Sequence, residues 1–290
     1  MISYPDDEAT ENEAERHGIP EPVLIRDLVR IVEVLNLAGK EFFGGERVLA
    51  GSMALRCFHS PRFTVYDADF ATSTEAQPAR GEMLGMLSYA DDDLEITPAE
   101  LTPHDARGSA WKSEPISYLP AFTALAPEDS RSFKADISSR GLVLPGIETG
   151  LEVPYDLGIW SEAPVVWIMD PHEIGAEKIL GWVLHREAKH YADLAFIALA
   201  AQPAAGPLLE IVPARLRETL AAKLEIMRGV QPTNYAPWSS VEDVARTLAE
   251  DPVFGSSDWG KLVYLRSRRD MFSQAMLKSA VQNLLVPMLR

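Results

Sequence analysis

Short apolar runs separated by turn residues fill the first half of the chain, and this pattern is typical of β-strands. One run covers Arg47–Ala50 and breaks at Gly51-Ser52, and a second covers Phe63–Ala71. Over Arg131–Ser139, apolar and polar residues alternate, so Asp136 and the other polar residues are expected on one face of a strand. The sequence therefore predicts a β-sheet in this half.

The second half of the chain has apolar residues at helical spacing, interrupted by proline, glycine or polar breaks. The predicted helices are Pro171–Leu184, Ala188–Ala200, Leu208–Arg228, Val241–Leu248 and Trp259–Leu289. A further helix is predicted in the N-terminal arm, from Val23 to Leu35. We therefore expect an α+β protein, with an α/β domain and its helical arm at residues 1–170 and a helical domain at residues 171–290.

Composition and charge narrow the classes of protein that the chain can belong to. Its 290 residues carry a net charge of −16 and one cysteine, Cys57, which excludes an internal disulfide and a cysteine-based zinc site. The first residues do not resemble a signal peptide, and no run approaches the roughly 18 apolar residues of a membrane span. We expect a cytoplasmic protein with no membrane partner. Residues 261–290 carry +5, a candidate surface for a polyanion.

Asp67 and Asp69 form the first candidate for chemistry. On a strand, residues two apart share a face, so the two carboxylates are expected to converge. Carboxylates this close repel each other, and a divalent cation relieves the repulsion. Mg²⁺ suits the pair because it binds carboxylates together with substrate phosphate oxygens. The alternative is a solvated strand face.

The turn at Gly51-Ser52 strengthens the metal interpretation. Glycine lets the backbone approach a ligand closely, and the helix start that follows favours an anion, with the Ser52 hydroxyl available to a phosphate oxygen. Taken alone, this is equally an ordinary tight turn with a serine cap. Followed by Asp67 and Asp69, it describes a triphosphate held by backbone and metal. Asp136 is the expected third carboxylate, as a metal ligand or as the base that accepts a proton.

Taken together, five segments carry a family resemblance: GSMALR, DADF, FKADIS, EKILG and HYADL. In this order they resemble the nucleotidyl transferase AbiEii/AbiGii toxin family, which includes the MenT toxins. The resemblance implies a polymerase-β-like core followed by a helical C-terminal region. It also implies functional roles for matching residues, namely Gly51, Ser52, Asp67, Asp69, Lys134, Asp136, Lys178 and Gly181. The last family motif, Asp-x-x-Asp-Leu, is partly present, with His190 in place of its first aspartate and Asp193 as its second.

Lys178 has a physical role independent of the resemblance. Its ammonium is expected to neutralise triphosphate charge, and Gly181, one helical turn later, is expected to leave room for the ligand. His190 and Asp193 are expected to contact the nucleotide, His190 through a hydrogen bond rather than a fixed charge. The alternative for Lys178 is a solvated helix face with ordinary ion pairs.

The resemblance implies a magnesium-dependent nucleotidyltransferase toxin of a toxin–antitoxin system. Such an enzyme transfers a nucleoside monophosphate from a nucleoside triphosphate to an acceptor, which the likeness to the MenT toxins suggests is the tRNA 3′ end. It also implies a cognate antitoxin protein as partner. Two alternatives are open: transfer to a protein or small-molecule hydroxyl, and a non-catalytic nucleotide-binding relic, for which His190 is the argument.

Overall fold

The structure is a computed structural model of the chain. It describes residues 7–19, 22, 47–58, 60, 62, 67–72, 89–90, 95–104, 117–126, 129–138, 143–151, 165–202, 209–250, 252, 259, 262 and 273–290. At residues 67–68, 89–90, 95–104, 117–126 and 129–138 it describes the backbone only. The helix predicted between Val23 and Leu35 lies outside the described residues.

The chain divides into two compact units. We call them the sheet unit, comprising Met1–His59, Thr64–Asp105 and Ser113–Met169, and the helical unit, comprising Ser60–Phe63, Ala106–Lys112 and Asp170–Arg290. Residues 60–63 therefore belong to the helical unit although the chain on both sides of them belongs to the sheet unit.

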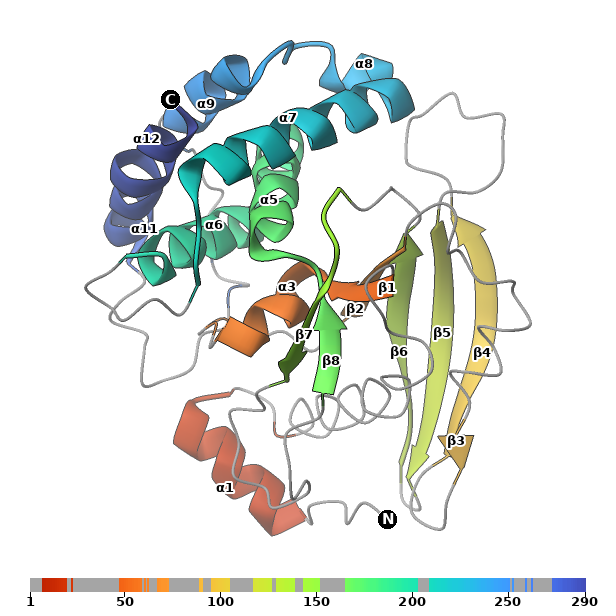
Figure 1. The fold of residues 1–290 in the computed structure, drawn as a ribbon. Helices are drawn as coiled ribbons and strands as arrows, with labels where there is room; N and C mark the ends of the chain where they lie inside the picture. Colours follow the sequence, from red (N-terminus) through yellow and green to blue (C-terminus); the bar gives the residue numbers. More distant parts are fainter. Residues whose placement is uncertain are drawn as a thin grey trace. The chain divides into compact units, whose positions relative to one another are not determined.

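The described strands of the sheet unit form one mixed sheet. They are β1 (Arg47–Ala50), β2 (Asp67–Thr72), β3 (Tyr89–Ala90), β4 (Glu95–His104), β5 (Ser117–Ala126), β6 (Asp129–Ser138), β7 (Ile147–Gly150) and β8 (Val165–Ile168). Their order is β3-β4-β5-β6-β2-β1-β8-β7, and Figure 1 shows β4, β5 and β6 as long neighbouring arrows. The predicted α+β class is confirmed.

The strand predictions hold at the centre of the sheet and differ at their ends. The strand predicted over Arg47–Ala50 is β1 with those bounds, and β2 is described from Asp67 onward. β6 begins two residues before the predicted run, at Asp129, because residues 129 and 130 pair with β5. Backbone pairing with a neighbouring strand, rather than alternation of side chains, sets this boundary.

Apolar side chains of β1, β2 and β8 form the described core of the sheet unit. Leu49, Phe70 and Ile168 are 1 % exposed or less. β1 lies between β2 and β8, so its two neighbours cover it along both edges. Each such side chain contributes about 1.5–3 kcal/mol through burial, which helps to fix the register of β2, the strand that carries Asp67 and Asp69.

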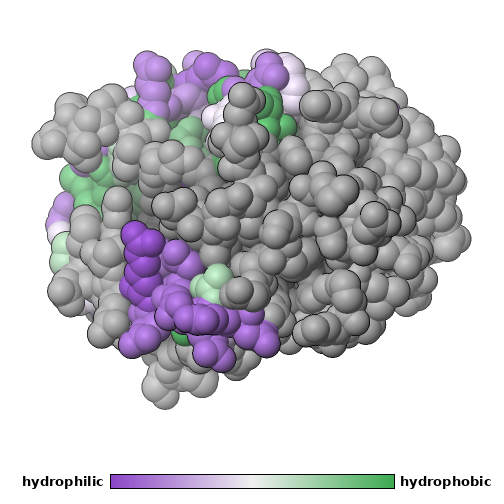
Figure 2. All heavy atoms as spheres, turned by 90° about the horizontal axis from the view of Figure 1, so that it is seen from below, coloured by the Kyte–Doolittle hydropathy of each residue, from purple (hydrophilic) through white to green (hydrophobic). Residues whose placement is uncertain are grey.

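The N-terminal arm contains the helix α1 (Asp7–His17). It ends at Gly18, which has φ +68°, and the amide of Ile19 donates to the Ala14 carbonyl, as in a Schellman motif. Its exposed face is mostly acidic, and it contributes to the hydrophilic patch seen from below in Figure 2. This face is polar and solvated, and we assign no site to it.

The helical unit contains most of the described helices. They are α5 (Pro171–His185), α6 (Ala188–Ala200), α7 (Pro213–Val230), α8 (Pro232–Tyr235), α9 (Val241–Ala249), α11 (Gln274–Ala280) and α12 (Val286–Leu289), with a π-helical segment (Val281–Leu285) between the last two. Their shared apolar core includes Trp182 of α5 and Tyr191 of α6, whose rings meet edge to face at 4.7 Å. None of the described helices is long and apolar enough to cross a membrane.

Most helix predictions are confirmed, but the single helix predicted over Trp259–Leu289 is wrong, because Leu262 is not helical and α11 begins after its capping residue Ser273. The bounds of α6 agree with the prediction, while α7 begins at Pro213 rather than Leu208. Proline suits a first helical turn because its missing N–H has no partner to lose there. The π-helical segment lies before Pro287, which cannot donate to the carbonyl four residues earlier, and the amide of Val286 donates five residues back, to Val281.

Candidate functional site

Gly51 and Asp69 lie against each other at the centre of the sheet unit. Ala50, the last residue of β1, pairs with Asp69 of β2, so the chain turns at Gly51 directly beside this aspartate. Gly51 has φ +64°, and a Cβ atom there would collide with a carboxylate oxygen of Asp69 and lie 3.0 Å from its Cγ. Only glycine therefore fits, for reasons of both conformation and space. Ser52 follows in the short helix α3 (Gly51–Ala54).

The sheet register brings the predicted carboxylate positions together. β2 and β6 are parallel neighbours, and Asp69 pairs with Asp136 while Asp67 pairs with Lys134. Asp69 and Asp136, far apart in sequence, thus occupy the same level of adjacent strands. The side chains of Asp67 and Asp136 lie outside the described part of the structure. Among the described side chains no three potential ligands gather around a metal position, so the metal site remains a prediction.

Asp193 is the centre of an ion-pair network in the helical unit. Its carboxylate is 1 % exposed and receives both forks of Arg62, with Nε 2.7 Å from Oδ1 and Nη2 2.9 Å from Oδ2. Lys178 Nζ of α5 lies 2.7 Å from the same Oδ2. Burial alone would raise the pKa of the Asp193 carboxyl, but Arg62 and Lys178 hold that pKa well below its ordinary value. Asp193 is therefore ionised at neutral pH.

The environment of Lys178 differs from that of an exposed surface lysine. Its side chain is 8 % exposed and forms a buried ion pair. The other two charged residues considered with it form different ion pairs. Glu177 pairs with Lys223 of α7, and Arg186 pairs with Glu250 at the surface. The solvated-face alternative therefore does not describe Lys178.

His190 fills the space that was predicted for a ligand beside Gly181. A Cβ atom at Gly181 would lie 3.1–3.3 Å from three atoms of the His190 ring, so the small residue accommodates this imidazole. Burial, together with the charge of Lys178, lowers the pKa of His190 to about 3, and the ring is neutral near pH 7. Its Nδ1 is buried and has no hydrogen-bond partner among the described residues.

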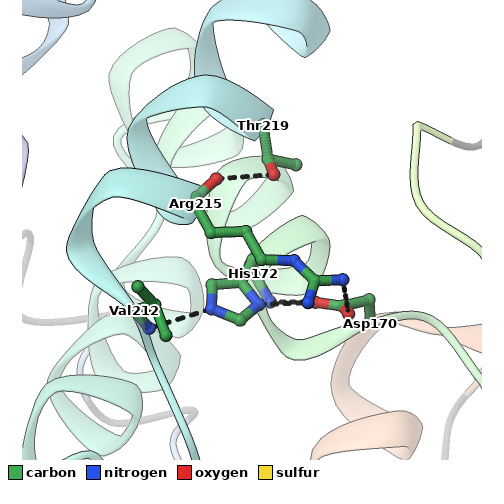
Figure 3. Close-up of polar contacts among 5 residues, drawn as sticks. All are labelled: Asp170, His172, Val212, Arg215 and Thr219. Atoms are coloured by element: carbon green, nitrogen blue, oxygen red, sulfur yellow. Dashed lines mark hydrogen bonds and ion pairs between the residues drawn. The ribbon is translucent and has the colours of Figure 1, made fainter.

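A second buried aspartate, Asp170, fixes the start of α5 (Figure 3). It caps the helix by accepting from the His172 amide at 2.8 Å, and its Oδ1 lies 2.7 Å from the His172 ring Nδ1. His172 Nε2 accepts from the Val212 amide at 2.9 Å, so the proton of the neutral ring lies on Nδ1. Arg215 of α7 donates to Asp170 Oδ2 at 2.8 Å. This cluster joins the beginnings of α5 and α7.

A buried lysine fixes the next turn of α5 against α7. Lys223 is 3 % exposed and pairs with Glu173, which is fully buried, and with Glu177 at 3.0 Å. Burial would lower the pKa of Lys223, but the two carboxylates raise it above its ordinary value. α5, which carries Lys178, is thus held on α7 by charge as well as by apolar packing.

The predicted site residues fall into two groups. The sheet unit holds Gly51, Ser52, Asp67, Asp69 and Asp136, and the helical unit holds Lys178, His190 and Asp193. Within the helical unit, Lys178 and Asp193 are in direct contact, and the charges of both act on the His190 ring. Arg62 was not predicted. It is a single arginine between the Gly51-Ser52 turn and the Asp67–Asp69 pair, where neither periodicity nor one of the quoted motifs marks it.

Comparison with known proteins gives an independent view of the chain. The family model described as "Nucleotidyl transferase AbiEii toxin, Type IV TA system" matches residues 35–281. Among curated proteins, no sequence matches the chain. Among solved structures, the MenT4 nucleotidyltransferase toxin from Mycobacterium tuberculosis is similar, at a TM-score of 0.66 and 17% identity over 97% of this chain and 89% of that one.

A second solved structure is a putative nucleotidyltransferase from H. pylori, at a TM-score of 0.45 and 15% identity over 92% of this chain and 93% of that one. The likeness to the mycobacterial toxin shows the fold, and the second likeness adds nothing to it.

Proposed function

Because the chain belongs to the nucleotidyl transferase AbiEii toxin family of type IV toxin–antitoxin systems, we propose that it transfers a nucleoside monophosphate from a nucleoside triphosphate to an acceptor hydroxyl. The observation that carries this proposal is the geometry at the end of β1. There the Asp69 carboxylate lies against Gly51, and Asp69 pairs in register with Asp136. A turn without a side chain next to paired aspartate positions is suited to a phosphate and its metal ion.

Asp67, Asp69 and Asp136 would hold Mg²⁺, and the donor set fits this ion because carboxylate oxygens are its preferred protein ligands. When bound, Mg²⁺ would polarise the α-phosphate and stabilise the departing pyrophosphate. Gly51 and Ser52 would bind the triphosphate through backbone amides and a hydroxyl. Asp136 would complete the metal site or accept the proton of the attacking hydroxyl.

Lys178, His190 and Asp193 would act on the same nucleotide. Lys178 would offset phosphate charge, and the neutral His190 ring would donate or accept a hydrogen bond without adding charge. Asp193 is buried under two cations, so we assign its effect on the nucleotide to its hold on Lys178.

We propose the tRNA 3′ end as the acceptor and an antitoxin protein as the regulatory partner. The acceptor rests on the resemblance to the MenT toxins, and the antitoxin on the family's place in type IV toxin–antitoxin systems. Nucleoside triphosphates and tRNA are cytoplasmic, so we propose that compartment for the activity. Of the charged residues in the basic surface predicted at residues 261–290, the structure describes Lys278 and Arg290.

Asp69→Asn tests the proposal. The amide keeps the size of the side chain but loses the charge that would hold Mg²⁺, so we expect transfer to fall at least about 100-fold with little change in stability. The assay incubates protein, Mg²⁺, each labelled nucleoside triphosphate in turn and total tRNA, followed by a denaturing gel. Asp7→Asn, the same change at an exposed position of α1, is the control and is expected to transfer normally.

The position of the label separates the alternatives. Label on RNA supports the tRNA acceptor, and label on the protein or on an added cell-extract protein supports protein nucleotidylation instead. Folded wild-type protein that labels nothing favours the non-catalytic relic. Full activity of Asp69→Asn would contradict the metal assignment.

A further inference from the structure

We propose that Arg62 is a positioning residue, which sets the place of the Lys178 ammonium through the Asp193 carboxylate. The inference rests on the proposed function, in which Lys178 offsets phosphate charge. It concerns a residue that no motif of the chain includes.

The contact between Arg62 and Asp193 is bidentate. Nε and Nη2 of the guanidinium bind separate oxygens of Asp193, at 2.7 and 2.9 Å. Two parallel hydrogen bonds fix the plane of the carboxylate as well as its distance, which a single bond does not do. The Asp193 oxygens therefore have defined directions within the buried interior of the helical unit.

Lys178 depends on one of those directions. Its Nζ binds Asp193 Oδ2, the oxygen that also receives Arg62 Nη2. If the carboxylate turned, Oδ2 would move, and the lysine ammonium would follow it or lose its partner. The flexible four-carbon stem of lysine does not fix its own end, so the partner has to do so.

Charge gives Arg62 a second effect on Lys178. Among these three side chains, two cations face one carboxylate. With Arg62 in place, the guanidinium offsets part of the Asp193 charge. The carboxylate then cancels less of the electrostatic field of Lys178. Without Arg62, Lys178 alone would face a buried carboxylate, and its attraction for a phosphate would weaken.

Arg62 differs from an arginine that only stabilises the fold. Arg215 also binds a buried aspartate of the helical unit, but it does so through one nitrogen, and its side chain is 46% exposed. The side chain of Arg62 is 11% exposed and binds through two. Asp170, the partner of Arg215, caps α5, whereas the partner of Arg62 binds Lys178. Arg215 is thus a matched control.

The test compares Arg62→Lys with Arg215→Lys in the intact protein. Lysine keeps the charge but cannot make two parallel bonds to one carboxylate, so it separates geometry from charge. We expect Arg62→Lys to lower kcat for nucleotide transfer about 10- to 100-fold, with KM for the nucleoside triphosphate changed less than threefold. Arg215→Lys should keep kcat within twofold. Urea unfolding of each variant reports the loss of stability separately.

A second variant tests the inference in case Arg62→Lys does not fold. The single change Arg62→Gln removes the guanidinium and leaves Asp193 paired with Lys178, so no buried charge loses its only partner. It should fold and show the same loss of kcat, because the Lys178 ammonium no longer has an oriented carboxylate.

The outcomes distinguish the inference from the proposed function. Wild-type kcat in a folded Arg62→Lys or Arg62→Gln variant would overturn the inference alone. An equal loss of kcat in Arg62→Lys and Arg215→Lys would also overturn it, since that would indicate a general structural effect. Absence of any transfer by the folded wild-type protein would overturn the proposed function, and the inference with it.

Discussion

Two buried aspartates of the helical unit, Asp170 and Asp193, have similar burial and very different surroundings. Asp170 is 3% exposed and binds mainly its own neighbourhood, the amide and ring of His172, with Arg215 added from α7. Asp193 is 1% exposed and binds Arg62 from 131 residues away together with Lys178 of α5. Asp170 caps a helix, whereas Asp193 forms ion pairs with two cations.

The difference shows that a buried carboxylate is satisfied by its local surroundings in one place and by distant cations in another. A cap is satisfied by groups that the local backbone supplies, so it needs little from the rest of the fold. A carboxylate with two cations needs distant segments to converge, and it holds a lysine in a defined place.

The largest effect is expected from neutralising each aspartate in turn. Asp193→Asn leaves two buried cations without their carboxylate, and we expect a loss of about 3–5 kcal/mol in the free energy of unfolding. Asp170→Asn keeps a capping side chain and loses a half-exposed ion pair, so about 1 kcal/mol is expected. Urea denaturation measures both, and equal losses would remove the distinction between the two sites.

The next effect concerns the pH dependence that the His190 ring gives to the free energy of unfolding. In the fold the pKa of His190 is lowered to about 3 from 6.5, so the unfolded chain binds a proton below pH 6.5 that the native state does not. Stability should therefore fall as pH falls, by about 2 kcal/mol from pH 7 to pH 5. Asp170 and Asp193, whose pKa values lie below 3.8, contribute only at lower pH.

His190→Asn should lose this part of the pH dependence in urea denaturation at pH 7 and pH 5. The control His185→Asn changes an exposed imidazole at the end of α5 and should keep the wild-type pH dependence. Identical pH dependence in wild type and His190→Asn would contradict a neutral buried ring at this position.

The smallest effect comes from the glycine that accommodates His190. Alanine at Gly181 gains helix propensity but pushes against the imidazole at 3.1–3.3 Å, so a net loss of about 1 kcal/mol is expected. Gly229→Ala of α7, with no atom within 4 Å of the new Cβ, should instead gain about 0.5–1 kcal/mol. Thermal unfolding measures both.

A rescue experiment identifies the cause at Gly181. If the imidazole is responsible, Gly181→Ala should cost nothing further in a His190→Ala background. A cost that persists there would place the clash elsewhere.

Local patterns predicted much of the fold. The break after Ala50 predicted the end of β1, and apolar spacing with Pro171 predicted α5 to within one residue. The same patterns predicted too early a start for α7 and a shorter β6, since a helix start depends on proline position and a strand end on its neighbour. The spacing of the acidic motifs did not predict that Asp69 pairs with Asp136, because the register of two strands is a property of the whole sheet.

Local sequence patterns predicted the α+β class, the Gly51 turn before an aspartate pair, and the helices that carry Lys178 and Asp193. Each of these follows from residues close together in the chain, where periodicity, turn chemistry and capping act. The contact of Asp193 with Arg62 and the packing of His190 against Gly181 depend instead on the three-dimensional fold. The physical reason is that a buried charge must be paired wherever the fold places it, and the segments that meet there can be distant in sequence.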